Sequence, residues 1–380
     1  MNQKAKSVSM SSAFAVAAVW FGSHFGPGNS TGKQALLYFT QYGKVGVLLP
    51  ILTMAVWSVC MYYAIEYSRA HNLHNYREFA KSLYSPMSFL AVFMEVSFAF
   101  ATVMACGACL SGAATIIETQ FAIPYYLTVF VLAALSLALA IFGAELVRKS
   151  SKWLTYGILA TLVIITVVAL TSDKSQLAEM WKVGGTEAQQ NVSIWYAIWR
   201  SLVYASFQTT LVVNIVSVSD NLKNKEESKW AAIFGFVINL AMLLALNLVV
   251  FAYSPITMGN NLPILSILIE IGMPWLIWLY VILVVLACVS SILGFLFGNI
   301  SRYSGMIKNV KSEPARATIV AVVFLAAAIA VTTLGLTGIV NKGFTVLGYM
   351  NLFAILIPVI VFGVIKTKKT DAENVSAENK

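Results

Sequence analysis

The sequence predicts an all-α integral membrane protein with ten transmembrane helices. Of its 380 residues, 59% are hydrophobic and only 11% are charged, whereas an average soluble domain has about 25% charged residues. The apolar residues gather into ten runs, each long enough to cross the roughly 30 Å of hydrocarbon in a bilayer. The Lys and Arg residues lie in short clusters between these runs, as expected for the cytoplasmic loops of a membrane protein.

The ten runs follow one another with mostly short polar connections. They cover residues 8–39, 44–67, 86–119, 124–143, 152–171, 194–219, 230–253, 274–303, 315–334 and 343–365. The first and the sixth runs are each interrupted. Because many further spans follow it, we interpret the first run as a membrane helix rather than as a cleaved signal peptide.

The basic residues set the orientation of these spans. A ten-span arrangement places these clusters on one side: Lys4 and Lys6; Arg69, Arg77 and Lys81; Arg148, Lys149 and Lys152; Lys223, Lys225 and Lys229; Arg302, Lys308, Lys311 and Arg316; and Lys366, Lys368 and Lys369. The loops of the other side hold only Lys44, Lys174, Lys182 and Lys342. Both termini are therefore expected in the cytoplasm. The same clusters explain the net charge of +9 without a nucleic-acid partner.

The order of elements predicts an inverted repeat of five plus five spans. Residues 1–171 form the first repeat, 172–192 an extracellular loop, 193–365 the second repeat, and 366–380 a cytoplasmic polar tail. Each half opens with an interrupted helix and has an unusually long third span. Because five is an odd number, the second half enters the membrane with the opposite topology.

The first interruption is expected to form part of a binding site. Residues 22–29 contain three glycines and one proline, so they cannot form a continuous helix. Backbone groups left unpaired at membrane depth are costly unless they line a cavity or meet a ligand. The candidate substrate-binding residues are Ser23, His24, Gly26, Gly28 and Asn29. The alternative is a plain helix kink.

The second interruption is a polar island in the sixth span. Residues 204–210 include the candidate substrate-binding residues Tyr204, Ser206 and Gln208, but neither glycine nor proline. Its position at the start of the second half favours a binding function. The alternative is that Ser and Thr hydroxyls bond back to their own helix without breaking it.

These features resemble the LeuT fold of the amino acid, polyamine and organocation superfamily, and in layout the uncharacterised YkvI-like bacterial membrane proteins. Gly26-Pro27-Gly28-Asn29 resembles the Gly-x-Gly-Asn motif of sodium-coupled symporters. The resemblance implies that backbone amides hold a substrate carboxylate there and that Asn29 faces a sodium ion. It also implies a bacterial cytoplasmic (inner) membrane location.

The same resemblance implies a second sodium site between the first and eighth spans. Its ligands would be the carbonyls of Gly22, Phe25 and Ala287 and the hydroxyls of Ser290 and Ser291. Five oxygen atoms suit a hard cation. The alternative for the two serines is close helix packing. The sixth span departs from the family because it lacks a glycine in its break.

Charged residues inside the spans offer a second means of coupling. Glu95 lies within the third span, where a carboxylate costs about 2.5–3.5 kcal/mol, and is a candidate proton site. The alternative is a Glu paired with the basic loop around Arg77 and Lys81. His24 could also titrate. Toward the outer surface, Glu118, Lys33 and Arg200 are placed where an ion pair could close the vestibule, and these residues form a candidate gate.

We therefore expect a secondary active transporter of a small polar organic solute, an amino acid or related compound, coupled to sodium or protons by alternating access. No cofactor other than a sodium ion is expected; the partners are solute, coupling ion and lipid bilayer. An Nramp-like transition-metal transporter, suggested by Cys106 and Cys109, and a membrane sensor remain alternatives. Gly26 replaces the metal-binding Asp of that family. No catalytic motif indicates an enzyme.

Overall fold

The computed structural model describes residues 8–73, 75–142 and 144–378. The basic residues Lys4 and Lys6 and the end of the polar tail, residues 379–380, lie outside this part. Every regular element within it is helical. Hydropathy and hydrogen bonding explain this, because a chain crossing lipid must satisfy its backbone groups within its own segments.

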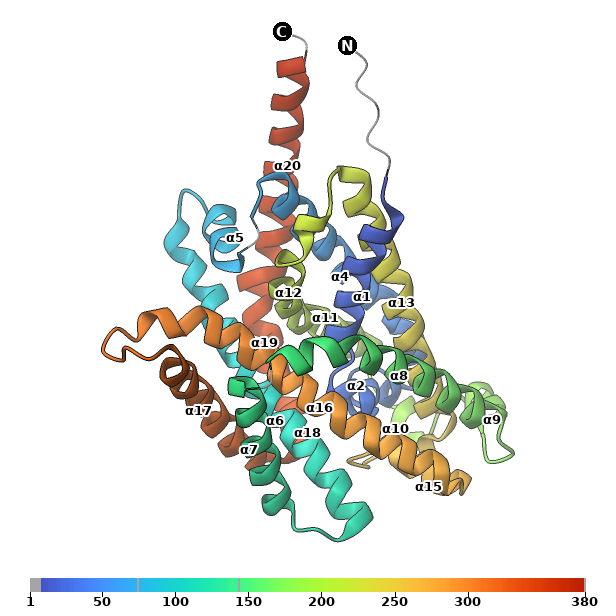
Figure 1. Ribbon diagram of the computed structural model, residues 1–380. Coiled ribbons are helices and arrows are strands. Elements are labelled where there is room, and N and C mark those ends of the chain that lie inside the picture. The colour runs from blue at the N-terminus through green and yellow to red at the C-terminus, as the bar shows by residue number, and fades with distance from the viewer. Residues whose placement is uncertain (1–7, 74, 143, 379–380) are drawn as a thin grey trace.

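The predicted spans correspond to helices throughout the first half (Figure 1). The first span is divided into α1 (Met10–His24), α2 (Pro27–Ser30) and α3 (Lys33–Tyr38). It is followed by α4 (Gly43–Ala70), α6 (Ala91–Phe121), α7 (Tyr125–Phe142) and α8 (Ala144–Thr171), with the short α5 (Tyr76–Leu83) before α6. The short α9 (Leu177–Val183) and α10 (Glu187–Gln190) lie in the connection to the second half.

The second half repeats this order of elements. Its spans are α11 (Ile194–Gln208) with α12 (Val212–Val216), α13 (Lys225–Ala252), α16 (Pro274–Tyr303), α17 (Glu313–Val331), and a last span made of α18 (Gly335–Gly338), α19 (Phe344–Asn351) and α20 (Ile357–Glu378). The short α14 (Ser254–Thr257) and α15 (Pro263–Ile271) precede α16, as α5 precedes α6. The long third spans are confirmed, since α6 has 31 residues and α16 has 30.

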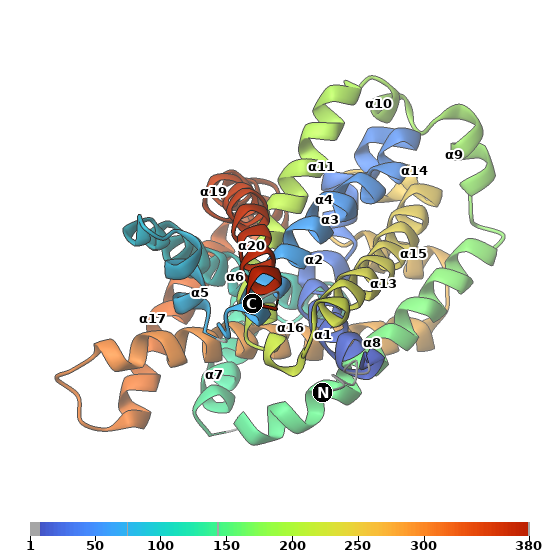
Figure 2. The same ribbon diagram turned by 90° about the horizontal axis from the view of Figure 1, so that it is seen from above.

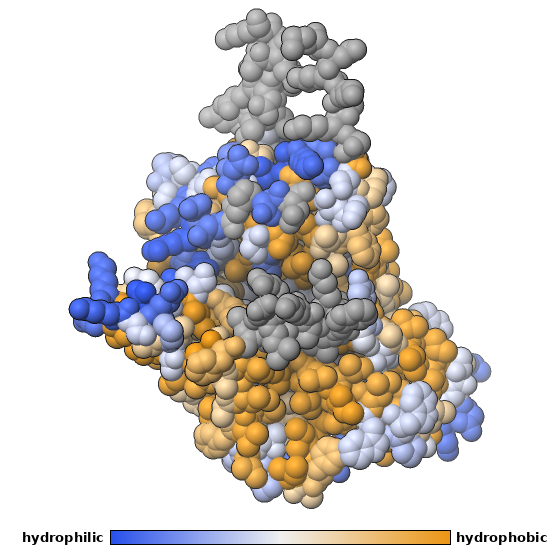
Figure 3. Space-filling view, in the orientation of Figure 1, coloured by the Kyte–Doolittle hydropathy of each residue, from blue (hydrophilic) through white to orange (hydrophobic). Residues whose placement is uncertain are grey.

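The outer surface suits a lipid environment. Within the described residues, six helical stretches are long and apolar enough to cross a membrane, and one of them, Glu313–Lys368, contains both α17 and the last span. On the face shown in Figure 3, hydrophilic residues gather around α5 and the turn before α17, and hydrophobic residues cover most of the body below. The start of α1 and the end of α20 lie at the same end of the molecule (Figure 1), as an even number of spans requires.

Helix α13 packs against both α1 and α4, and the three helices form the frame of the central site (Figure 2). A glycine allows this close packing, because a Cβ atom at Gly235 of α13 would lie 2.1 Å from the ring of Trp20. Trp20 in turn meets Trp57 of α4 edge to face, with ring centroids 4.9 Å apart. These fully buried rings hold the inner end of α1 in place.

Candidate functional site

The first break is a true interruption of the helix. Helix α1 ends at His24, and α2 begins at Pro27, which has no N–H group to continue the helical hydrogen bonds. The Gly26 N–H donates to the His24 carbonyl at 2.8 Å, and the N–H groups of Asn29 and Ser30 donate to the Gly26 carbonyl at 3.1 and 3.0 Å. Most backbone groups at the break are thus paired within the chain.

Side chains from five helices converge beside this break in what we call the central polar cluster: His24, Asn29, Gln34, Tyr204 and Asn239. His24 Nδ1 lies 2.7 Å from Asn239 Oδ1, and His24 Nε2 lies 2.8 Å from the Tyr204 hydroxyl. That hydroxyl is also 3.1 Å from Asn29 Oδ1 and 3.2 Å from Gln34 Oε1. All five side chains are buried, so the cluster links both interrupted spans through buried hydrogen bonds.

The amide of Asn239 determines where the His24 ring carries a proton. Its Nδ2 donates to the Gly235 carbonyl at 2.8 Å, which turns Oδ1 toward His24 and requires a proton on Nδ1. A neutral ring then accepts the Tyr204 proton at Nε2. A doubly protonated ring donates to Tyr204 instead, and the Tyr204 hydroxyl then donates to Asn29 or Gln34. The charge of His24 therefore sets the direction of this hydroxyl.

Aromatic rings enclose the cluster. The Trp57 ring lies 4.7 Å from the His24 ring, and the Phe39 and Phe207 rings each lie 4.9 Å from the Tyr204 ring. Tyr38 lies 5.3 Å from Tyr204. Such a wall excludes water and strengthens the polar interactions inside it. Aromatic walls around a few polar groups are typical of sites for small organic ligands.

The second interruption is one 3₁₀ turn, Thr209–Leu211, between α11 and α12. Hydroxyl back-bonding accompanies it, since Thr209 Oγ1 donates to the Ser206 carbonyl at 2.6 Å and Thr210 Oγ1 donates to the Phe207 carbonyl at 2.9 Å. Asn351 Nδ2 of α19 also donates to the Phe207 carbonyl, at 3.1 Å. Hydroxyl groups of the polar island, together with Asn351, thus pair with carbonyls at the point where the helical twist changes.

The structure separates the predicted substrate residues into three groups. His24, Asn29 and Tyr204 belong to the central polar cluster, and the buried Gln208 follows Tyr204 by one helical turn. Ser206 instead donates to the Gly348 carbonyl at 2.6 Å, and Ser23 accepts from Asn214 Nδ2 at 3.1 Å. Gly26 and Gly28 form the third group.

Open space surrounds the position of a Cβ atom at Gly26, whereas one at Gly28 would lie 2.4 Å from Gln34 Nε2. Gly28 thus makes room for a cluster residue. Gln34 and Asn239 are not recognisable as site residues from the sequence. The available signal was a single polar residue within an apolar run, which does not distinguish a functional side chain from a structural one.

The residues of the predicted second sodium site lie on both sides of a helix contact. Helix α16 packs against α2, where the Tyr280 hydroxyl donates to the Ser30 carbonyl at 3.1 Å. Phe25, Ser30 and Tyr280 line a cavity of about 30 Å³, which is large enough to hold a water molecule. Ala287 is buried, Gly22 is exposed, Ser290 is half-buried, and Ser291 lies beside Cys109 of α6. The sodium site stays a prediction.

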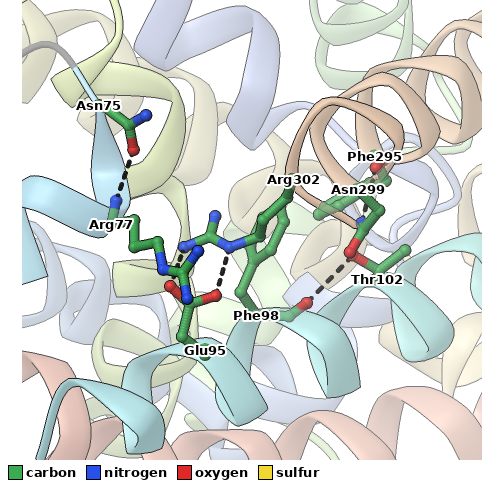
Figure 4. Close-up of polar contacts among 8 residues, drawn as sticks. All are labelled: Asn75, Arg77, Glu95, Phe98, Thr102, Phe295, Asn299 and Arg302. Carbon is green, nitrogen blue, oxygen red and sulfur yellow. Dashed lines mark hydrogen bonds and ion pairs between the residues drawn. The ribbon is translucent and has the colours of Figure 1, made fainter. Parts of the chain in front are cut away.

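Glu95 lies in an ion pair, as the alternative interpretation of its position suggested (Figure 4). Arg302 of α16 approaches the carboxylate with Nη2 at 2.6 Å from Oε1, and Arg302 Nε donates to Oε2. The guanidinium also lies over the rings of Tyr76 and Phe98, 4.7 and 5.3 Å from their centroids. The partner is Arg302 rather than Arg77 or Lys81. A proton-coupling role for Glu95 stays a prediction.

The three residues considered for an external ion pair do not pair with one another. Glu118 is exposed and accepts from the Tyr125 N–H at 3.3 Å. Lys33 Nζ donates to the Asn260 carbonyl at 2.5 Å, and Arg200 contacts neutral side chains on the last span.

Solved transporter structures are similar to this fold. A Na⁺-coupled sialic acid symporter aligns with a TM-score of 0.64 at 14% identity, over 94% of this chain and 89% of its own. A manganese transporter of Eremococcus coleocola aligns with a TM-score of 0.59 at 13% identity, over 97% of this chain and 89% of its own. A nucleobase-cation-symport-1 family transporter with a bound hydantoin aligns with a TM-score of 0.58 at 16% identity, over 90% of this chain and 78% of its own. At these identities, the similarity establishes the LeuT fold.

A search of curated proteins finds no significant match. The model of the amino acid permease family, in contrast, matches residues 12–308, which include both interrupted spans and α16. Family and fold together indicate a secondary transporter in the membrane rather than an enzyme. The chain therefore belongs to the amino acid permease family.

Proposed function

We propose that this protein transports a small polar organic solute, an amino acid or a related compound, by alternating access. The central polar cluster carries the proposal. It lies where the two interrupted spans meet, it is closed off by aromatic rings, and its hydrogen-bonding groups come from α1, α2, α3, α11 and α13. In transporters with broken helices, solute and ion sites lie at this meeting point near the middle of the bilayer.

The chemistry of the cluster favours a solute with several hydrogen-bonding groups. Tyr204 has a single proton but three neighbouring groups, on His24, Asn29 and Gln34, within 3.2 Å. The hydroxyl cannot donate to all three at once. A solute that carries its own donors can pair with the remaining oxygen atoms, and its apolar part can contact Phe39 and Phe207.

We propose coupling to sodium or to protons. The resemblance of Gly22, Phe25, Ala287, Ser290 and Ser291 to a sodium site supports the first. Glu95, a carboxylate within the third span, and the imidazole of His24, which contacts the Tyr204 hydroxyl, are the candidate proton sites that support the second. Sodium remains our preference, because the five resembling positions come from two helices.

Transport of a transition metal and sensing without transport are the competing functions. Within the described part of the chain, no three His, Cys, Asp or Glu side chains come together as metal ligands. Cys106 and Cys109 are buried on α6, and Cys109 lies beside Cys288 of α16. Packing between α6 and α16 is therefore the simpler account of the cysteines.

Counterflow in proteoliposomes tests the proposal. Purified protein is reconstituted and loaded with one unlabelled amino acid, and the uptake of the same labelled amino acid is followed with sodium or proton gradients in separate runs. We expect saturable counterflow that Tyr204→Phe weakens, with protein-free liposomes as the control. Binding without counterflow would instead indicate a sensor, and uptake of Mn²⁺ without amino acid uptake would indicate a metal transporter.

We also propose that both termini face the bacterial cytoplasm. The support is the asymmetry of basic residues and the common end of α1 and α20. Single cysteines near Arg77, Lys225 and Lys308 should resist a membrane-impermeant reagent added to intact cells, whereas one near Lys182 should react. Labelling in the reverse pattern would invert this topology.

A further inference from the structure

Arg200 of α11 is a buried cation without an acidic partner. Its residue is 4% exposed, and among the ion pairs of the described residues none includes Arg200. Its contacts are with neutral groups instead. Nη1 donates to Thr345 Oγ1 at 2.7 Å, Nη2 donates to Asn341 Oδ1 at 3.1 Å, and Nε has no hydrogen-bond partner although it is buried.

The position of Arg200 connects it to the central polar cluster. It precedes Tyr204 by one helical turn, so both side chains occupy the same face of α11. The ring of Tyr38 lies between them, with the Arg200 guanidinium carbon 4.5 Å from its centroid and the Tyr204 ring 5.3 Å away. Arg200 therefore lies directly next to the cluster.

The last span supplies the neutral groups that contact this guanidinium. Asn341 lies in a π-helical turn, Ile339–Gly343, and Thr345 follows in α19. The Tyr38 hydroxyl donates to the Val340 carbonyl of the same turn at 3.0 Å. Turns of this kind occur often at functional sites, because they turn side chains and carbonyls out of helical register.

A buried charge paired only with neutral groups is costly, and among the described residues no carboxylate forms an ion pair with Arg200 that would offset the cost. An anionic ligand would supply the negative charge that Arg200 lacks as a partner. A guanidinium presents donors in a planar fork that matches a carboxylate, and Nε with one Nη could form a two-point contact once Thr345 or Asn341 moves away.

The first break is less suited to this anion than its sequence suggests. The resemblance to sodium-coupled symporters implies that amides at residues 26–29 hold a substrate carboxylate. Here the N–H groups of Gly26 and Asn29 already donate to carbonyls of the chain and Pro27 has no N–H group, so of these four residues Gly28 alone has an N–H left for a carboxylate. An anionic group in the site therefore finds a stronger partner in Arg200.

We propose that Arg200 binds the carboxylate of the transported solute, so that the substrate is an organic acid or amino acid with a free carboxylate. This inference rests on the proposed transport function and deepens it. When the solute is absent, Arg200 returns to Thr345 and Asn341 and joins α11 to the last span. The solute carboxylate replaces these neutral partners.

The test compares each acid with a matched ligand that lacks the negative charge. Binding of the standard amino acids to the full chain is measured in detergent, followed by binding of the primary amide and the methyl ester of the best ligand. The acid preference is the ratio of dissociation constants, amide over acid. We expect about 10- to 100-fold in the wild type, the usual contribution of hydrogen bonds between charged groups.

Three variants separate the charge from the structure. Arg200→Gln should reduce the acid preference to about one, and Arg200→Lys should leave an intermediate value because it keeps the charge but not the fork. Lys44→Gln is the matched control. Lys44 is an exposed cation that also lies over a ring, 4.9 Å from the centroid of Trp181. Its acid preference should equal that of the wild type.

The outcomes distinguish this inference from the function on which it rests. A wild type that binds or transports solutes equally well as acid and as amide contradicts the role of Arg200 alone. An undiminished acid preference in a folded Arg200→Gln variant contradicts it as well, and gel filtration shows whether that variant is folded. If Arg200→Gln does not fold, the decision rests on Arg200→Lys. An acid preference in that variant equal to that of the wild type would contradict the two-point contact. A wild type that neither binds nor transports any of these solutes contradicts the proposed function and this inference with it.

Discussion

A methyl group added at Gly28 should displace Gln34 and disturb the central polar cluster. The added Cβ atom would lie 2.4, 2.5 and 2.5 Å from Nε2, Cδ and Cγ of Gln34. Because Cγ is among these atoms, a rotation of the amide end alone does not remove the overlap. Gln34 is 5% exposed and has little room to move. Overpacking of this kind usually costs about 1–3 kcal/mol.

Two further variants show whether this overlap is the cause. Gly26→Ala is the matched control, since it changes a glycine of the same break where a Cβ atom meets open space. Gln34→Ala removes the side chain that Gly28→Ala would strike and loses its contact with Tyr204, which contributes about 1 kcal/mol. In the double variant, Gly28→Ala with Gln34→Ala, the overlap is absent. It should therefore be no less stable than Gln34→Ala alone.

Thermal unfolding in detergent micelles at one fixed scan rate measures these differences. The melting temperature of Gly28→Ala should fall by a few degrees and that of Gly26→Ala should stay near the wild type. The two changes at Gly28 and Gln34 should be strongly non-additive, with a coupling energy close to the cost of the overlap. Additive effects, or equal melting temperatures for the two glycine variants, would show that Gln34 does not pack on Gly28 as described.

Three other changes test the remaining parts of the site. His24→Ala removes the His24 partner of Asn239 Oδ1 and one of the three partners of the Tyr204 hydroxyl, and it should lower stability by about 1–3 kcal/mol in thermal unfolding, more than Tyr204→Phe does; an equal or smaller effect would contradict the cluster. Glu95→Gln leaves Arg302 without its ion-pair partner, so the melting temperature should fall. The pH response of uptake should persist in this variant. Loss of that response would assign the coupled proton to Glu95. Ser290→Ala and Ser291→Ala should each weaken the sodium dependence of solute binding, and unchanged sodium titrations in both would remove the sodium site.

The spans could be predicted because lipid allows few solutions. A long apolar run between basic clusters forms a helix almost regardless of detail, and the observed helices follow the predicted runs closely, from α4 at Gly43–Ala70 to α16 at Pro274–Tyr303. The first break could be predicted for an equally local reason, since Pro27 cannot continue α1. The closer likeness to YkvI-like proteins stays a prediction.

Residue partners could not be predicted, because they depend on contacts between distant segments. Asn239 is 215 positions from His24, and Arg302 is 207 positions from Glu95. A lone asparagine in an apolar span indicates that some partner exists but not which one. The second interruption shows the same limit, since its polar residues were recognised but its 3₁₀ form depends on Asn351 of α19.

Arg200 shows that a residue can be recognised in the sequence while its contacts cannot be predicted. Its place near a helix end suggested an ion pair that closes the outer vestibule, with Glu118 as the acidic candidate. The π-helical turn at Ile339–Gly343 has no signal in the sequence, yet it brings Asn341 to the guanidinium, while Glu118 remains exposed elsewhere. A gate made of two opposite charges would close without a solute. A cation held by neutral groups releases them most readily to an anion, which is why we propose that the carboxylate of the solute supplies the negative charge that pairs with Arg200.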